Sequence, residues 1–238
     1  MATVLLLRHG LTELTGPVLA GRTPGVKLDE RGRRQSQAAA ERLAVLPLAM
    51  VATSPIERCA QTAKFVLDAQ RAAGRTPARR VERRLAECDY GDWTGQQIKT
   101  LTKDPLWKVV QANPSAVTFP NGEAMAAMAE RGIRGIRELD AAITAEHGDA
   151  AIWVACSHGD LIKAILADAL GMHLDLFQRI VVDPCSVSAI RYSAGRPFVL
   201  FSNSTSGDLS AYQPPAGKRR RRAVAQATVG GGSGAGSV

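Results

Sequence analysis

The chain opens on the stretch Thr3-Val4-Leu5-Leu6-Leu7-Arg8-His9-Gly10-Leu11-Thr12-Glu13. Its first five residues are β-formers and aliphatics, which predicts a short buried strand that ends at Gly10. Arg8 and His9 then lie at the carboxyl end of that strand, the edge of an open α/β sheet where ligands bind. A neutral imidazole is a nucleophile near pH 7, and a guanidinium matches phosphate or carboxylate. The pair suits an anionic substrate; the alternative is a structural histidine beside a surface ion pair.

The remainder of the chain alternates predicted strands and helices. This order predicts an α/β fold: a three-layer sandwich with a mostly parallel sheet flanked by helices on both faces, and an antiparallel strand pair at the end. Apolar runs and helical spacing define the elements. The predicted strands cover residues 3–7, 50–52, 79–85, 151–156, 186–192 and 198–202, and the predicted helices cover residues 29–46, 54–74, short segments around 98 and 106–110, 123–147 and 160–170.

Two predicted helices begin with specific signals. Asp29 is the expected N-cap of the first. Ser54 is the expected N-cap of the second, because Pro55 suits a first helical turn and Glu57 completes a capping box. Arg58 falls in that first turn, so a second guanidinium stands beside a partly positive helix end, an arrangement that binds anions. An exposed arginine on a helix surface is the alternative.

The four histidines fall into two classes. His9 and His158 each follow an apolar strand, so parallel strands would bring them to one sheet edge. His147 precedes Gly148 at a helix end and His173 lies in a turn, positions that favour structural roles. His9 and His158 lack the i, i+4 spacing of paired metal ligands, so a metal site is the weaker alternative. The four cysteines form no Cys-x-x-Cys pair, which indicates reduced thiols and disfavours structural zinc.

Length and composition bound the class of protein. The 238 residues, 45% hydrophobic and 22% charged, are typical of a soluble protein and suffice for one α/β domain. No apolar run approaches the roughly 18 residues of a membrane span. The N-terminus also lacks the basic-then-apolar layout of a signal peptide. We therefore expect a cytoplasmic protein without a membrane span.

The C-terminal segment differs in composition from the rest. Residues 217–238 contain Lys218 and Arg219–Arg222 and no acid, which accounts for +5 of the net charge of +8 and leaves +3 for the body. We expect one domain over residues 1–213 and a flexible basic and Gly/Ser-rich tail over residues 214–238. The basic pI therefore gives no argument for a nucleic-acid-binding fold. Weak retention on nucleic acid or an anionic membrane through the tail is the alternative to a solvated terminus.

Four separated motifs carry a family resemblance. In chain order they are Arg8-His9-Gly10; Thr53-Ser54-Pro55 with Arg58 and Gln61-Thr62; Glu87 with Tyr90-Gly91-Asp92-Trp93-Thr94-Gly95; and Ser157-His158-Gly159. In order and surroundings they resemble the histidine phosphatase superfamily, most closely its phosphoglycerate-mutase-like branch. The resemblance covers about residues 3–204 and leaves the tail outside.

The resemblance implies a metal-independent phosphatase that hydrolyses a phosphomonoester through a phosphohistidine intermediate. The implied partner is a phosphorylated small molecule, and no cofactor is implied. By resemblance, His9 takes the phosphoryl group and Glu87 protonates the leaving oxygen. The implied catalytic residues are His9, Glu87 and His158, and the implied substrate-binding residues are Arg8, Arg58, Thr15 and Gly159. Many proteins of this architecture dimerise, but no sequence feature establishes a homodimer.

Glu87 has two interpretations. A carboxyl near the apolar rings of Trp93 and Tyr90 would keep a raised pKa, as a general acid requires. The alternative is a surface carboxylate that pairs with a cluster of arginines, namely Arg80, Arg83 and Arg84.

The chain departs from the family pattern at three points. Thr15 stands where members often carry asparagine, although a hydroxyl can still bond phosphate. Cys88 stands where mutases place an arginine that holds a substrate carboxylate, and the arginine-rich insertion of mutases is missing. Both losses favour hydrolysis. The alternatives are a cofactor-dependent phosphoglycerate mutase or other phosphomutase, and a phosphate-binding scaffold without turnover.

The sequence does not identify the phosphomonoester. Specificity is expected to come from the loop before Leu28 and from residues 95–122, because loops on a rigid scaffold carry binding residues. Within that segment the side chains expected to face a ligand are Trp107, Phe119 and Asn121.

Overall fold

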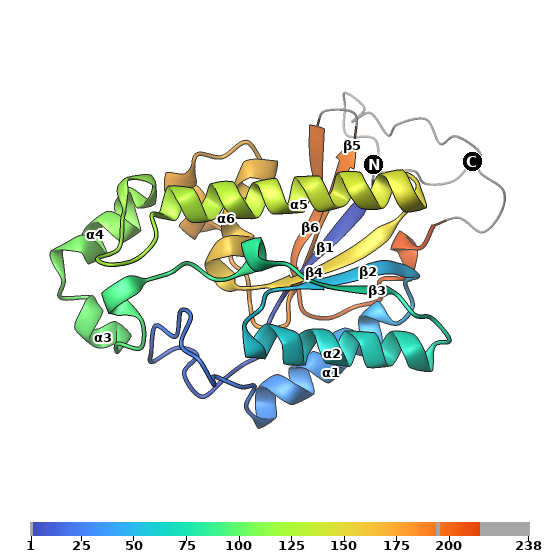
Figure 1. Ribbon diagram of the computed structural model, residues 1–238, viewed down its shortest axis with the longest axis horizontal. Helices are drawn as coiled ribbons and strands as arrows, with labels where there is room; N and C mark the ends of the chain where they lie inside the picture. Colours follow the sequence, from blue (N-terminus) through green and yellow to red (C-terminus); the bar gives the residue numbers. More distant parts are fainter. Residues whose placement is uncertain (1, 194–195, 215–238) are drawn as a thin grey trace.

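A six-stranded sheet forms the middle of the molecule in a computed structural model that describes residues 2–193 and 196–214 (Figure 1). The strand order is β3-β2-β4-β1-β5-β6. Strands β3, β2, β4 and β1 are parallel, whereas β5 runs antiparallel to β1 and β6 antiparallel to β5. The predicted mostly parallel sheet with a final antiparallel pair is confirmed. The strands are β1 (Thr3–Arg8), β2 (Leu48–Thr53), β3 (Ala78–Val81), β4 (Ile152–Ser157), β5 (Val187–Ser193) and β6 (Arg196–Ser204).

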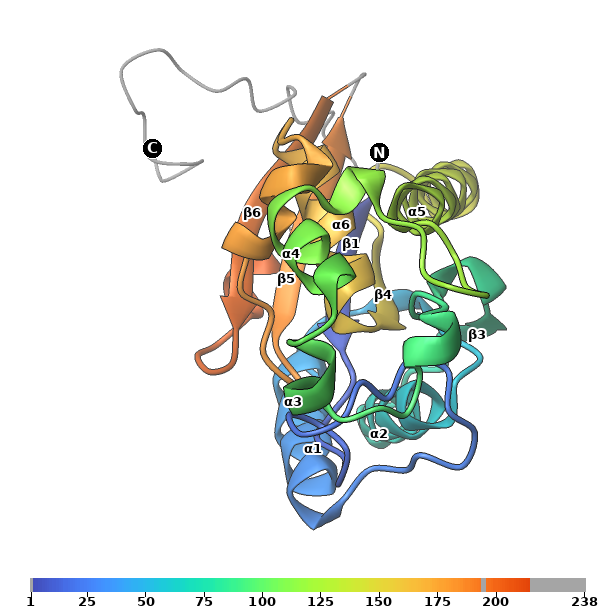
Figure 2. The same ribbon diagram turned by 90° about the vertical axis from the view of Figure 1, so that its left-hand side faces the viewer.

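Helices cover both faces of this sheet, as predicted (Figures 1 and 2). Helices α1 (Glu30–Leu43) and α2 (Glu57–Ala72) pack together on one face. Helices α5 (Met125–His147) and α6 (Gly159–Ala169) pack together on the other. The short helices α3 (Ile98–Leu101) and α4 (Pro105–Ala112) project beyond the end of the sheet (Figure 1).

The side chains of β1 show how the two layers are held. Val4 and Leu6 belong to the apolar cluster that includes residues of α5 and α6, whereas Leu5 and Leu7 belong to the cluster that includes residues of α1 and α2. All four are at most 1% exposed. A strand with both faces covered reads as a continuous apolar run, because successive side chains point to opposite faces. The opening stretch therefore encodes a central strand.

One predicted helix start is correct and one is wrong. The Asp29 carboxylate accepts a hydrogen bond from the amide of Gly32 and caps α1. Ser54 does not cap α2, which begins at Glu57 after an N-cap residue, Ile56, that makes no side-chain cap bond. The Ser54 hydroxyl lies 2.8 Å from Nε2 of His158, and its oxygen also accepts the Ile56 amide. The Ser54 side chain, which the local sequence predicted to cap the helix, instead contacts His158 from a distant part of the chain.

Other boundaries shift by a few residues. The strand predicted over 79–85 ends at Val81, and a 3₁₀ turn, η1 (Arg83–Leu85), replaces its second half. The Glu82 carboxylate explains the change, because it accepts the amide and the guanidinium of Arg84 and caps this turn. The helix predicted to residue 46 ends at Leu43, and that predicted from residue 123 begins at Met125.

Among residues 2–193 and 196–214, no helix is long and apolar enough to cross a membrane. The predicted tail over 214–238 lies outside the described residues, except for Pro214.

Candidate active site

Strands β1 and β4 bring the two strand-end histidines to one place. The strands pair in register from Thr3 with Ile152 to Arg8 with Ser157. The next residues along each strand are His9 and His158, whose ring centroids lie 5.2 Å apart. Both residues are buried, at 6% and 0% exposed. The parallel pairing therefore places two imidazoles edge to face at the carboxyl end of the sheet.

The hydrogen bonds of His9 fix its tautomer. Nδ1 lies 2.8 Å from the carbonyl oxygen of Gly10, which can only accept, so Nδ1 carries the proton. Nε2 is then unprotonated, and it accepts a hydrogen bond from Nε of Arg58 at 3.1 Å. Burial and the charges of Arg58 and Arg8 hold the pKa of His9 well below its usual value. The imidazole is therefore neutral near pH 7, with a lone pair on Nε2.

Two arginines surround this lone pair with donors. Arg58 is 2% exposed, which excludes an exposed arginine on a helix surface. Its Nη2 donates to the carbonyl of Gly21 and to Nδ1 of His158, at 2.7 and 3.2 Å. Arg8 donates from Nη1 to the carbonyl of Val182. Arg58 Nη1 and Arg8 Nε are buried with no partner among the described residues.

Unpartnered buried donors on cations are costly, because each loses its water without gaining an acceptor. An anion with several acceptor oxygens would satisfy both nitrogens at once. This pocket therefore combines positive charge, buried donors that have no partner among the described residues, and a neutral imidazole.

His158 has both ring nitrogens engaged. Nδ1 accepts from Arg58, so Nε2 carries the proton and donates to the Ser54 hydroxyl. The Cys59 thiol lies 3.4 Å from the same Nε2. Burial, the largest cause, and the charge of Arg58 lower the pKa of His158 well below its usual value. His158 is thus a neutral ring that orients the Arg58 guanidinium.

Glu87 lies in the segment between η1 and a second 3₁₀ turn, η2 (Gly91–Trp93). It is 7% exposed. Burial and the charge of Asp160 raise the pKa of Glu87 to about 7, although the amide of Cys88 and the charges of Arg58 and Arg8 oppose the shift. The carboxyl can therefore be protonated near neutral pH, as a proton donor must be.

The surface alternative for Glu87 is wrong. Arg80 and Arg84 pair with Glu82, and Arg84 also pairs with Glu138. Burial, the predicted cause of the raised pKa of Glu87, is its largest cause, and the charge of Asp160 adds to it. The Tyr90 hydroxyl donates to the Asp160 carboxylate at 2.8 Å.

The remaining predicted residues differ in their placement. Gly159 is the first residue of α6, and a Cβ there would lie 3.5 Å from the Arg8 guanidinium, an ordinary contact distance. Thr15 turns to its own loop, where its hydroxyl bonds the amide and hydroxyl of Thr12 at 3.0 Å. The structure brings Arg8, His9, Arg58, Gly159 and His158 together. Among the described residues, no hydrogen bond links Thr15 to them.

The side chains that were expected to face a ligand mostly contact other residues of the protein. Phe119 is 2% exposed and lies edge to face with Tyr90. Trp107 stacks on Trp93 with ring centroids 6.1 Å apart, and Asn121 donates to the Asp92 carboxylate. The prediction that these side chains face a ligand is wrong for Phe119, because the ring belongs to the core.

Sequence reasoning missed several charged residues beside the site. Asp160 follows His158 by two positions, which is a signal that local inspection could have used. The others come from distant segments and show no local pattern; they are Arg22, Glu123 and Arg131. Within residues 2–193 and 196–214, no three or more His, Cys, Asp or Glu side chains are arranged to hold a metal ion. The four cysteines are free thiols, as predicted.

Comparisons with known proteins identify the family to which the chain belongs. A probable phosphoglycerate mutase GpmB of Proteus mirabilis is 29% identical over 203 residues, which cover 81% of this chain and 86% of the relative. Phosphoserine phosphatase 1 of Hydrogenobacter thermophilus is 28% identical over 211 residues, 86% and 93% of the two chains. A mycobacterial glucosyl-3-phosphoglycerate phosphatase superposes with a TM-score of 0.72 at 25% identity, covering 85% and 98%. The model of the histidine phosphatase superfamily (branch 1) matches residues 4–205, and the chain belongs to that family.

Proposed function

We propose that the protein is a metal-independent phosphomonoesterase that acts on a phosphorylated small molecule through a phosphohistidine on His9. One observation supports this most directly: Arg8 Nε and Arg58 Nη1 are buried and unpartnered beside an unprotonated ring nitrogen of His9. A phosphoryl group has the oxygens to accept from both nitrogens and the phosphorus for Nε2 to attack.

In the first step the phosphate displaces the contact between Arg58 and His9. Arg58 Nε donates instead to a phosphoryl oxygen, which frees the Nε2 lone pair. Nε2 then forms a bond to phosphorus while the bond from phosphorus to the leaving oxygen breaks. Arg8 and Arg58 stabilise charge on the equatorial oxygens. Glu87 in its acid form gives its proton to the leaving oxygen, so the product departs as an alcohol.

In the second step water attacks the phosphohistidine. Glu87, now a carboxylate, takes a proton from the water, and the bond from phosphorus to Nε2 breaks to release inorganic phosphate. A group with a pKa of about 7 can serve as acid and then as base at neutral pH. The arginines supply the positive charge in this scheme, so it calls for no metal.

Hydrolysis is proposed over phosphoryl retention because of Cys88. Its side chain is 0% exposed, and burial raises the pKa of its thiol, so the residue carries no charge. A neutral buried thiol cannot hold a substrate carboxylate as an arginine would. A cofactor-dependent phosphoglycerate mutase or other phosphomutase is the alternative, and the names of several relatives, which are probable phosphoglycerate mutases, support it.

The test is hydrolysis of p-nitrophenyl phosphate in the presence of EDTA. We expect phosphate release, trapping of a phosphorylated protein, and loss of both in His9→Ala. His147→Ala is the matched control, because His147 ends α5 before the start of β4, at the end of the sheet opposite the pocket, and pairs with Glu146. Release that persists in His9→Ala would overturn the proposal. Conversion of 3-phosphoglycerate to 2-phosphoglycerate with little free phosphate would establish the mutase instead.

A further inference from the structure

The Glu87 carboxyl has little of its own to hold it in place. Among the hydrogen bonds of the described residues, its side chain makes one, in which Oε1 accepts the Cys88 amide at 3.1 Å. The segment that carries it is neither helix nor strand. The position of the acid therefore depends on what fixes the backbone around it.

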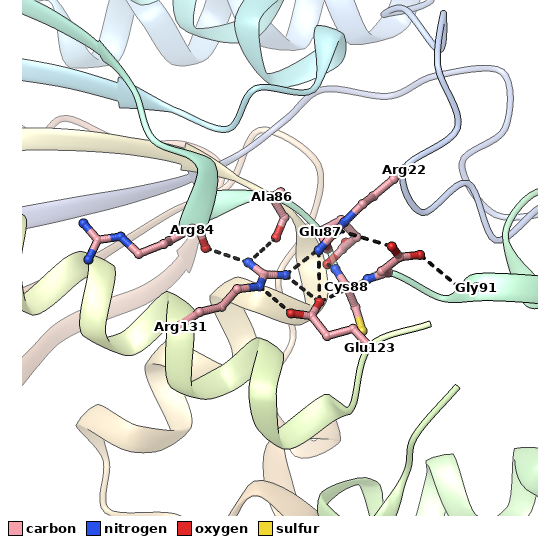
Figure 3. Close-up of polar contacts among 9 residues, drawn as sticks. Arg22, Arg84, Ala86, Glu87, Cys88, Gly91, Glu123 and Arg131 are labelled. Atoms are coloured by element: carbon pink, nitrogen blue, oxygen red, sulfur yellow. Dashed lines mark hydrogen bonds and ion pairs between the residues drawn. The ribbon is translucent and has the colours of Figure 1, made fainter. Parts of the chain in front are cut away.

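Arg131 fixes that backbone (Figure 3). From the second turn of α5, its Nη1 donates to the carbonyls of Arg84 and Ala86 at 2.7 and 2.8 Å. Its Nη2 donates to the carbonyl of Glu87 at 3.1 Å. One planar guanidinium thus holds three carbonyls of the acid segment. Lysine could not do this, because its ammonium is a single point from which donors diverge.

A second guanidinium reaches the same carbonyl from the other side. Arg22 Nε donates to the Glu87 carbonyl at 2.9 Å. The Glu123 carboxylate joins the two arginines: it accepts from Nε and Nη2 of Arg131 at 2.6 and 2.8 Å and from Nη2 of Arg22 at 3.0 Å. It also accepts the Asp89 amide. We call Arg22, Glu123 and Arg131 the acid clamp.

The acid clamp also connects to the nucleophile. Gly21, the residue before Arg22, accepts from Arg58 Nη2 through its carbonyl, and Arg58 Nε contacts His9. A continuous path of short contacts therefore links the carbonyl of Glu87 to the ring of His9. This path ties the backbone of the proton donor to the residue that holds the attacking nitrogen. Among the described residues, none of the three clamp side chains makes a hydrogen bond to His9 or to the Glu87 carboxyl.

We propose that Arg131, held by Glu123 and Arg22, is a positioning residue that keeps Glu87 where it can protonate the leaving oxygen. The inference rests on the function proposed above. The proposal gives the arginines of the two regions different roles. Arg8 and Arg58 act on the phosphoryl group, whereas Arg131 acts only through Glu87.

Leaving-group dependence tests this role. Phenyl, 4-chlorophenyl and 4-nitrophenyl phosphates have similar shapes, but the phenolate of the first is the strongest base and most needs a proton. The ratio kcat/KM reports the first phosphoryl transfer. We expect Arg131→Met to lower kcat/KM for phenyl phosphate at least tenfold and that for 4-nitrophenyl phosphate less than threefold, within the roughly 10²- to 10⁴-fold that general acid catalysis supplies.

Two further variants complete the experiment. Arg131→Lys keeps a cation opposite Glu123 for folding but cannot span the three carbonyls, so an intermediate leaving-group effect is expected. Arg137→Met is the matched control, because Arg137 lies on the same helix and pairs with Asp168 on α6. We expect its kcat/KM to match that of the unmodified protein for all three esters.

The outcomes are distinct. An equal fall for all three esters in both Arg131 variants, or no fall in either, overturns the positioning role even if His9→Ala abolishes turnover. Persistence of turnover in His9→Ala overturns the proposed function instead.

Discussion

The histidine pocket and the acid clamp use arginines in opposite ways. In the pocket, Arg58 and Arg8 each keep a buried nitrogen without a partner. In the acid clamp, Arg131 donates to three carbonyls and to both oxygens of Glu123, which leaves no nitrogen unused. Both regions lie at the carboxyl edge of the sheet, within one network of contacts. Because the surroundings are shared, the different use of the arginines reflects different roles of the two regions.

Buried donors without an acceptor lower the free energy of unfolding, so a protein retains them mainly where they serve function. Under the proposed function, the pocket gives up stability in order to bind the anionic phosphoryl group during turnover. Arg131 loses nothing in this way, because each of its five N–H donors has an acceptor in the clamp or in the acid segment. This contrast predicts that activity and stability separate between the two regions.

The largest effect is expected for Arg58→Met. Because the substitution removes a donor to the phosphoryl group, kcat/KM for p-nitrophenyl phosphate should fall by about 10³-fold. Stability should change by only about 1 kcal/mol, because a costly buried cation with an orphaned nitrogen is removed along with three hydrogen bonds. Urea unfolding beside the kinetics makes the comparison. A loss of several kcal/mol would show that Arg58 is structural.

Arg131→Met should lower the free energy of unfolding more than Arg58→Met does. The side chains of Arg131 and Glu123 are 16% and 17% exposed, so the pair is well shielded from water. Breaking such a pair leaves Glu123 with Arg22 and the Asp89 amide, and it removes the donor to the carbonyls of Arg84 and Ala86. The Glu87 carbonyl keeps Arg22, and the expected loss is about 3 kcal/mol. The midpoint of urea unfolding measures it. Arg134→Met, which breaks an exposed pair with Glu130 on the same helix, should cost less than about 1 kcal/mol. Equal losses for the two variants would contradict the contrast.

Glu87→Gln tests the acid itself through stability. Burial raises the pKa of Glu87 from 4.5 to about 7, so the folded state favours the protonated form. For an acid with a raised pKa, stability is lost as pH rises between these two values. Glutamine mimics the protonated acid, so the variant should be more stable than the unmodified protein at pH 8, by up to about 3 kcal/mol at 1.36 kcal/mol per pKa unit. At pH 5, just above the unfolded pKa, the advantage should fall below about 1 kcal/mol.

The buried histidines titrate in both proteins, so their contribution cancels in this difference. An advantage of Glu87→Gln that stays constant from pH 5 to pH 8 would show that Glu87 is not the group that titrates.

Local signals were enough to predict the sheet and the meeting of His9 with His158 at its edge. The apolar runs before His9 and His158 predicted two central strands, and parallel strands with the same ending bring their next residues together. The capping prediction at Ser54 failed because His158, 104 positions away, binds the hydroxyl. A cap is a local inference, and nothing local reveals a competing partner of that kind.

The acid side was less accessible for the same reason. The motif placed Glu87, and the apolar neighbours correctly suggested burial. The second charge was hidden, because Tyr90 reaches Asp160 across 70 positions. Arg131 and Glu123 were equally hidden. Eight positions apart near the start of a helix, they look like an ordinary exposed pair until the fold places three carbonyls opposite the arginine.

The smallest expected effect concerns that second charge. In the proposed scheme kcat/KM falls above the pKa of Glu87, because the acid form donates the proton. Asp160 raises that pKa, whereas Arg58 and Arg8 lower it. In Asp160→Asn the opposing arginines remain, so the pKa of Glu87 should fall and the basic limb of the profile should move to lower pH by roughly half a unit.

Tyr90→Phe separates this charge from the hydrogen bond that holds it. The substitution removes the hydroxyl that donates to Asp160 but leaves the carboxylate, so the basic limb should stay near its original pH. The substrate's own titration is common to all three proteins and cancels when their profiles are compared. A limb that stays in place in Asp160→Asn would mean that burial alone sets the acid. If the basic limb shifts only in Tyr90→Phe, then Tyr90 sets the pKa of Glu87 by packing rather than by holding Asp160. In that case the acid clamp alone would not position Glu87, and the segment leading into η2 would contribute as well.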